Sequence, residues 1–261
     1  RADLEKFLKE DREGYEKFYA NYGRQIGYGI VSEGGEARKD ALKDLLMFYS
    51  STQKKLTTLH EYLERMKPEQ KCIYYAAGES AAAIDRLPQT ELLKDKDYEV
   101  LYLTGEADEF VLQALAKYEE KPFRSIVDGD LELDGEEEKL LDEKEDLMKF
   151  VKETLGDRIK EAKASHRLKT HPVCLTAGEG FSFEMEKYFR NFQMPEPIKA
   201  DRILELNVKH PAVMAMETAL LTDRSKAELY AKILYDQALL IAGLPLDDPG
   251  EYTDMVAQLM K

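Results

Sequence analysis

The sequence has few of the residues on which metal and disulfide chemistry depend. Its 261 residues include two cysteines, Cys72 and Cys174, and four histidines. Two distant cysteines are too few for a disulfide framework or a zinc site, which indicates a reducing compartment. No histidine stands at a metal-ligand spacing from another ligand type. We therefore expect no metal and no cofactor in this chain.

The chain has fewer basic residues than acidic ones. Lys and Arg total 38 against 52 Asp and Glu, which gives a net charge of −14. Because nucleic acids and anionic membranes are bound through basic surfaces, the sequence predicts neither partner. No apolar run approaches the roughly 18 residues of a membrane-spanning helix. The chain has no signal peptide and opens with Arg1 rather than Met, so we expect a piece of a longer protein.

The length and one break in composition predict two domains. At about 150 residues per domain, 261 residues correspond to roughly two. Residues 128–146 carry eleven acidic residues and two lysines, which we interpret as a solvated linker. We therefore expect one domain over 1–132, with helices over 1–66 and an α/β subdomain over 67–132. The other domain is expected over 133–261.

The first domain changes its hydrophobic period along the chain. Apolar residues recur at helical spacing through the first 65 residues, including the set Leu42, Leu45, Leu46 and Tyr49. Short apolar runs at 72–76, 100–103 and 123–127 then alternate with helical patterns at 80–87 and 108–118. This alternation predicts parallel crossover units in a small three-layer α/β/α subdomain.

The second domain is predicted to be α+β. Strand patterns at 159–164, 173–176 and 203–206 accompany helical patterns at 149–155 and 181–192. Ser225 and Glu228 form a capping-box pattern that is expected to open a helix ending at Gly243. Asp248 and Pro249 are expected to open a last helix.

These two terminal helices are strongly apolar with little chain left to cover them, which indicates a partner surface. A second copy of the chain is the simplest partner. The residues expected at this dimer interface are Leu229, Ile233, Leu234, Leu240, Tyr252, Met255, Val256 and Leu259.

An aromatic-rich helix at 181–192 has two interpretations. Phe181, Met185, Tyr188 and Phe189 share one helical face. Such a face is usual for a helix packed on a core, but Met and aromatic residues also recur at adaptable binding surfaces. Periodicity leaves both interpretations open.

Segments along the whole chain resemble the ninety-kilodalton heat-shock chaperone family. The sequence YLERMKPEQKCIYYAAGES at 62–80 resembles the signature of the family's middle domain. On either side, EKFYANYGRQIGYGI, ALKDLLMFYSS, YEVLYLTGEADEF and KPFRSIV are similar to its neighbouring segments. SHRLKTHPVCLTAGEG, LELNVKHP and ILYDQALLIAGLPLDDP resemble the family's C-terminal dimerisation domain.

The resemblance implies part of an ATP-driven molecular chaperone. The chain would hold the later part of the middle domain and the dimerisation domain, whose last helices form an intermolecular four-helix bundle. ATP and magnesium would bind an N-terminal domain upstream of Arg1. This chain is therefore expected to have no enzymatic activity, although the full-length protein would be an ATPase.

The resemblance also implies partners and site residues. We expect a homodimer that binds unfolded or partly folded client proteins. We expect it in the bacterial cytoplasm, because the end of the chain lacks the tails of eukaryotic cytosolic and ER members. The client-binding residues implied are Glu109, Phe110 and Gln113 in the middle domain and Phe181, Met185, Tyr188 and Phe189 in the C-terminal domain.

Two rival interpretations remain. In the first, the chain is a structural dimerisation scaffold in which the helix at 181–192 is buried as core. In the second, it is an enzyme that binds a small ligand at the strand ends of the α/β unit over 72–127. We find no convergent set of polar residues in the sequence for that second role.

Overall fold

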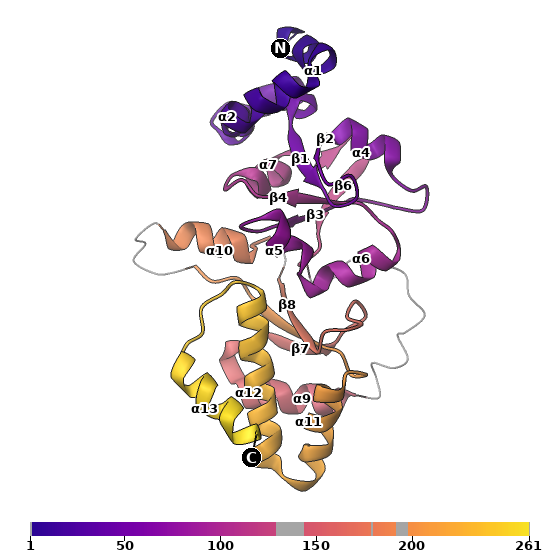
Figure 1. Ribbon diagram of the computed structural model, residues 1–261. Coiled ribbons are helices and arrows are strands. Elements are labelled where there is room, and N and C mark those ends of the chain that lie inside the picture. Colours follow the sequence, from indigo (N-terminus) through magenta and orange to yellow (C-terminus); the bar gives the residue numbers. More distant parts are fainter. Residues whose placement is uncertain (1, 129–143, 179, 192–197, 261) are drawn as a thin grey trace. The chain divides into compact units, whose positions relative to one another are not determined.

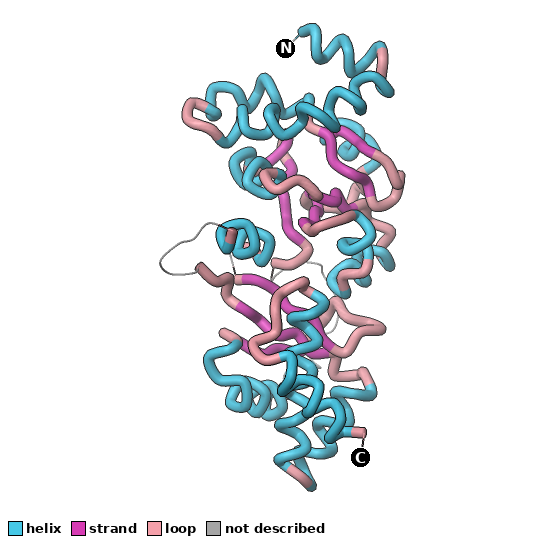
Figure 2. The backbone as a smooth tube through the Cα atoms, turned by 60° about the vertical axis from the view of Figure 1, so that its left-hand side comes forward, coloured by secondary structure: helices cyan, strands magenta, loops and turns pink. Residues whose placement is uncertain are grey.

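The computed structural model describes residues 2–128, 144–178, 180–191 and 198–260. The chain divides into two compact units of mixed α/β structure (Figures 1 and 2). Unit 1 comprises Arg1–Arg86 and Leu93–Ile126, and unit 2 comprises Leu87–Leu92 and Val127–Lys261. The boundary predicted between residues 132 and 133 lies outside the described residues.

Unit 1 contains a six-stranded sheet with the strand order β2-β1-β4-β3-β6-β5. The strand β3 is parallel to both β4 and β6, as expected for crossover units, and the other pairs are antiparallel. The strand expected at 123–127 begins and ends two residues earlier, and β5 was not predicted. The strands are β1 (Met47–Ser50), β2 (Leu56–Thr58), β3 (Ile73–Ala77), β4 (Val100–Leu103), β5 (Lys117–Tyr118) and β6 (Lys121–Ser125).

The helices of unit 1 begin at polar capping residues in several places. Asp11, Thr58 and Ser80 each accept a hydrogen bond from a backbone N–H in the first turn of a helix. The α-helices are α1 (Ala2–Glu10), α2 (Arg12–Val31), α3 (Lys39–Leu42), α4 (Leu59–Arg65), α5 (Ala81–Asp85), α6 (Glu91–Asp95, which straddles the two units) and α7 (Asp108–Leu115). Short 3-10 turns lie at 35–38 and 43–45, and a third, at 88–90, belongs to unit 2.

The helix predicted through Leu42 and Tyr49 is wrong. The chain leaves the helical conformation at Leu46 and forms β1, which pairs with β2 and β4. Leu45, Leu46, Met47 and Phe48 are consecutive and all buried. A short apolar run buried on every side fits a helix and a strand equally well, so its period does not distinguish them.

Unit 2 contains a three-stranded sheet with the order β7-β9-β8, so the last strand in sequence is central. Strand β9 is parallel to β7 and antiparallel to β8. Helices α9, α11 and α12 supply core residues that pack with this sheet, and α10 lies apart from that helical layer in both views (Figures 1 and 2). The elements are α9 (Glu145–Leu155), β7 (Glu161–Ala164), β8 (Val173–Ala177), α10 (Phe183–Arg190), β9 (Arg202–Leu206), α11 (Pro211–Thr222), α12 (Arg224–Ile241) and α13 (Pro249–Leu259).

The start of α12 differs from its prediction. Asp223, not Ser225, is the capping residue, and its Oδ1 accepts a hydrogen bond from Lys226 N at 3.1 Å. Asp223 also ends α11, a helix that the sequence analysis missed. The predicted end at Gly243 and the predicted Asp248 cap of α13 are confirmed.

A short segment of chain from the middle of unit 1 belongs to unit 2. Residues Leu87–Leu92 leave the first unit, and the chain returns to it at Leu93. Gln89 Nε2 donates a hydrogen bond of 2.6 Å to Leu175 O on β8. Glu91 accepts hydrogen bonds from the backbone N–H groups of Lys169 and Thr170. These hydrogen bonds attach residues 87–92 to β8 and to the loop before it in unit 2.

Candidate functional site

The first candidate surface lies on α7 in unit 1. Of the three residues implied there, Gln113 is exposed, Phe110 is half-buried and Glu109 is buried. They stand at helical positions i, i+1 and i+4, so Glu109 and Gln113 lie one above the other. This surface is therefore polar at its exposed end, with one aromatic ring beside it.

Close packing against α2 fixes the position of α7. A Cβ atom at Gly27 would lie 3.1 Å from Val111 Cγ2, so the missing side chain lets the two helices approach. At the start of α7, Asp108 Oδ2 accepts a hydrogen bond from Gly105 N at 2.9 Å. Burial raises the pKa of Asp108 to about 6, and that hydrogen bond opposes the rise.

The second candidate surface lies at the start and end of α10 in unit 2. Phe181 stacks on Phe189 with ring centroids 6.0 Å apart, and Tyr188 meets Phe189 edge-on at 5.5 Å. All three rings are half-buried, and Phe181 also packs against the core of unit 2. We call these three residues the aromatic cluster. Its rings keep part of their apolar surface in contact with solvent.

Met185, which the resemblance implies as a client-binding residue, does not lie on the exposed part of this surface. Met185 is 3% exposed, and Phe183 and Glu186 are buried as well. The helix begins at Phe183 because Ser182 Oγ accepts a hydrogen bond from Met185 N at 3.1 Å. Helix α10 is thus amphipathic: one face is buried, and the residues of the aromatic cluster are half-buried.

The residues expected at a dimer interface divide into three groups by burial. Ile233, Leu234 and Met255 are buried within the chain, and Leu234 belongs to the core of unit 2. Leu240 is 50% exposed. The remaining four are half-buried: Leu229, Tyr252, Val256 and Leu259.

Further exposed apolar residues lie on or beside the C-terminal helices, outside the set expected at the dimer interface. Leu221 on α11 is 83% exposed, and Met214 lies exposed two turns before it. Met260, just after α13, is exposed as well. The signal for α11 was present, since Pro211 occupies the first helical position after His210, whose Nδ1 accepts a hydrogen bond from Ala212 N.

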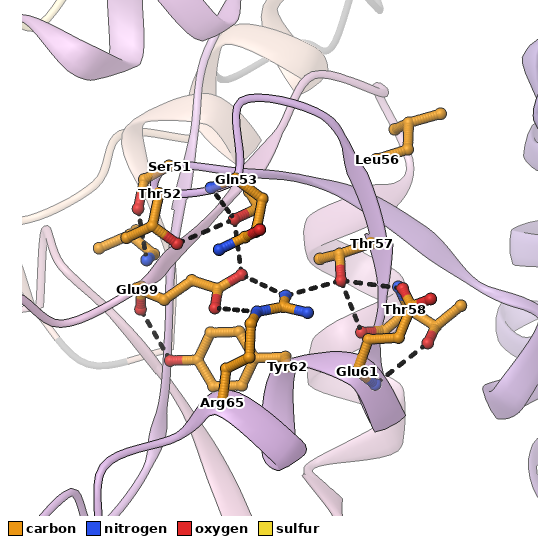
Figure 3. Close-up of polar contacts among 12 residues, drawn as sticks. Ser51, Thr52, Gln53, Leu56, Thr57, Thr58, Glu61, Tyr62, Arg65 and Glu99 are labelled. Carbon is orange, nitrogen blue, oxygen red and sulfur yellow. Dashed lines mark hydrogen bonds and ion pairs between the residues drawn. The ribbon is translucent and has the colours of Figure 1, made fainter.

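A polar network in unit 1 joins β1, β4 and α4 (Figure 3). Arg65 Nε donates to Glu99 Oε2 at 3.0 Å, and Arg65 Nη2 donates to Glu99 Oε1 at 2.7 Å. Ser50 Oγ donates to the same Oε1 at 2.6 Å, and Thr57 Oγ1 accepts from Arg65 Nη2 at 2.8 Å. These hydrogen bonds hold α4 to the strands of the sheet in unit 1.

The described residues offer little support for nucleophile or metal chemistry. Cys72 and Cys174 are both buried, and burial raises the pKa of the Cys174 thiol well above its usual value. Within the described ranges, no group of three or more His, Cys, Asp or Glu side chains could hold a metal ion. In that same part of the chain, no helix has both the length and the apolar character needed to cross a bilayer.

Comparison with known proteins finds relatives along the whole chain. A family profile described as Hsp90 protein matches residues 2–261. The chain is 48% identical over 264 residues to the chaperone protein HtpG of Clostridium acetobutylicum, covering 100% of this chain and 42% of that protein. It is 46% identical over 263 residues to HtpG of Halalkalibacterium halodurans (99% and 42%) and 45% identical over 265 residues to HtpG of Bacillus subtilis (100% and 42%). The chain therefore spans less than half the length of these relatives.

Proposed function

Because the chain belongs to the Hsp90 family, we propose that it is the part of a molecular chaperone that dimerises and binds partly folded client proteins. The family and the HtpG relatives support the chaperone role. We assign dimerisation and client binding to apolar side chains that stay at least partly exposed in each unit.

The aromatic cluster of α10 is the observation that carries client binding. Phe181, just before α10, and Tyr188 and Phe189, near its end, form two ring contacts with centroids 6.0 and 5.5 Å apart, and all three residues are half-buried. Burial of apolar surface stabilises a contact by about 25 cal/mol per Å² and has no directional requirement. A cluster of this size therefore suits weak, reversible contact with the apolar segments that a partly folded protein exposes.

Helix α7 is proposed as a second contact for clients. Phe110 supplies the apolar surface there, and Gln113 supplies hydrogen-bonding groups one turn from Glu109. The exposed amide of Gln113 can donate hydrogen bonds to the backbone carbonyl groups of a client and can accept them from its backbone N–H groups. The two helices belong to different units, so we assign each its own contact.

Dimerisation is proposed for the C-terminal helices. Leu221, Leu240 and Met260 are large apolar side chains that are at least half exposed on unit 2. They come from α11, α12 and the end of α13, and α12 packs against both other helices; exposed apolar surface on such a group is a candidate for a contact with another protein. A second copy of the chain is the occupant that we propose, since symmetric homodimers are the commonest assemblies.

Nucleotide chemistry is proposed for the rest of the full-length protein. ATP and a magnesium ion would bind there, and hydrolysis of the ATP would supply the free energy for conformational cycling. No residue of this chain is assigned a role toward them, and no enzymatic activity is proposed for it. We propose the bacterial cytoplasm as the location, in line with the bacterial relatives.

The test replaces Phe181, Tyr188 and Phe189 together by Ser. We expect the affinity for a fluorescently labelled, reduced and carboxymethylated unfolded protein to fall by about tenfold or more, because aromatic anchors dominate such contacts. The matched control replaces two exposed aromatic residues of α2, Tyr22 and Tyr28, by Ser.

Thermal unfolding and solution mass are measured for each variant, so that misfolding and dissociation are recognised. If the triple variant folds, dimerises and binds the unfolded protein as tightly as wild type, client binding by the aromatic cluster is wrong. The chain would then fit the dimerisation scaffold better.

A further inference from the structure

Helix α10 carries a buried carboxylate that binds partners both within the helix and outside it. Glu186 is 3% exposed, although it lies in the middle of a helix of eight residues. Its Oε2 accepts a hydrogen bond from Ala200 N at 2.9 Å. Its Oε1 accepts from Arg202 Nη2 at 2.9 Å and from Arg190 Nη2 at 3.0 Å. One side chain therefore binds both its own helix and the chain that leads into β9.

The partners of Glu186 are themselves held in place. Arg202 is the first residue of β9, and its backbone pairs with Ala177 of β8. Arg202 Nη1 donates to Ala200 O at 2.9 Å, so the guanidinium bridges the backbone carbonyl and the carboxylate. This arrangement ties α10 to the sheet of unit 2 through charged hydrogen bonds, which are stronger than neutral ones.

A second contact fixes the rotation of α10. Lys187 Nζ lies 2.5 Å from Glu184 Oε1 within the helix. A Cβ atom at Gly243 would lie 2.8 Å from Lys187 Nζ, so the ammonium group sits against the end of α12. A cation is favoured beside the carboxyl end of a helix. Glu186 and Lys187 thus contact two different elements of unit 2.

We infer that Glu186 is a positioning residue for the aromatic cluster, which it holds in a fixed orientation toward solvent. This inference rests on the client-binding role proposed above. A helix of two turns is marginal in isolation, so its order depends on tertiary contacts such as these. A pre-ordered cluster binds a client without first losing the entropy of a mobile helix.

The test compares Glu186→Ala with Glu186→Gln and Glu184→Ala. The Gln variant keeps an oxygen that can accept from Ala200 N but removes the charge. The Glu184 variant is the matched control, because it also removes a carboxylate from α10. The described ion pair of Glu184, with Lys187, stays within the helix. Amide hydrogen exchange of α10, affinity for the labelled unfolded protein and thermal unfolding are measured on the whole chain.

We expect Glu186→Ala to speed exchange in α10 by about tenfold, since local opening then costs less. Its affinity for the unfolded protein should fall about fivefold, as expected when a preorganised surface is lost. Glu186→Gln should restore part of both values, and Glu184→Ala should match wild type. If Glu186→Ala prevents folding, the Gln variant decides the question alone.

The outcomes separate this inference from the function on which it rests. If the triple Ser variant loses affinity while both Glu186 variants bind like wild type, client binding stands and the positioning role is wrong. If faster exchange in α10 leaves affinity unchanged, the positioning role is wrong as well. If the triple Ser variant itself keeps full affinity, both fail together.

Discussion

Arg65 holds Glu99 through two hydrogen bonds, of 2.7 and 3.0 Å, in unit 1. Glu99 directly precedes β4 and is 7% exposed, whereas the Arg65 side chain is 31% exposed. The hydrogen bonds to Glu99 raise the pKa of Arg65. The pair joins α4 to the central strands of the sheet, so its loss affects tertiary structure.

Replacement of Glu99 by Ala is expected to destabilise unit 1. The change removes the carboxylate that accepts hydrogen bonds from Arg65 and Ser50. We expect the free energy of unfolding to fall by about 2–3 kcal/mol; the loss is no larger because the Arg65 side chain is partly solvated. Denaturant unfolding measures this loss. Glu106→Ala is the control, because its ion pair with Arg24 is exposed and should be worth less than about 1 kcal/mol. Equal effects of the two changes would contradict the prediction.

Asp236 predicts a pH dependence of stability in unit 2. This carboxyl group of α12 is 6% exposed, and burial raises its pKa to about 6, while Arg158 opposes the rise and Asp247 adds to it. The folded state therefore binds a proton more tightly than the unfolded state, whose pKa is about 4. This stabilisation is complete below about pH 4 and is lost as the pH rises through 6.

Asp236→Asn should remove this contribution. The free energy of unfolding of the variant, relative to wild type, should increase by about 2 kcal/mol between pH 4 and pH 7. Unfolding curves of both proteins across that range give the difference directly. The same substitution at exposed Asp157 is the control for removing a carboxyl group from the surface of unit 2. A flat difference for Asp236 would mean that its carboxyl group titrates normally.

Leu240→Glu should dissociate the proposed dimer without unfolding the chain. The side chain is half exposed, so a charge there costs little in a monomer but is expensive in an apolar interface. We expect the dissociation constant to rise by about a hundredfold or more, measured by sedimentation over a concentration series. Ile198→Glu, at another exposed apolar residue of unit 2, is the control. A wild-type chain that is monomeric at every concentration would contradict the dimer itself.

The cap of α12 can be tested by a pair of substitutions. Asp223→Ala removes the acceptor of Lys226 N and should lower the free energy of unfolding by about 1 kcal/mol. Ser225→Ala should change it by less than about 0.5 kcal/mol, because Ser225 lies inside the first turn. The reverse order of these effects would favour the capping box that the sequence alone predicts.

The sequence predicted those elements whose pattern is local. Strands β3, β4 and β8 are short apolar runs between turn residues, and Asp248 before Pro249 marks the start of α13. Strand β1 failed because its buried run has no distinguishing period. Helix α11 was missed although Pro211 marks its first position.

The candidate sites were predicted only as residue sets. Sequence patterns place Phe181, Tyr188 and Phe189 near one another, but they do not show which face of α10 is buried. That depends on Glu186 meeting Arg202, a contact between separate elements. Met185 is buried by the same packing. Periodicity shows that Met185 and the aromatic residues share a face, but it does not show which of them are buried.

The path of the chain through Leu87–Leu92 sets an order of assembly. A protein is synthesised from its N-terminus, and its domains generally fold as units. The six strands of unit 1 end at Ser125, so they can pair before the second half exists. Gln89 must wait for the carbonyl of Leu175, which is made much later. Unit 2 therefore completes its structure with residues synthesised as part of the first half, and no single cut of the chain would release it whole.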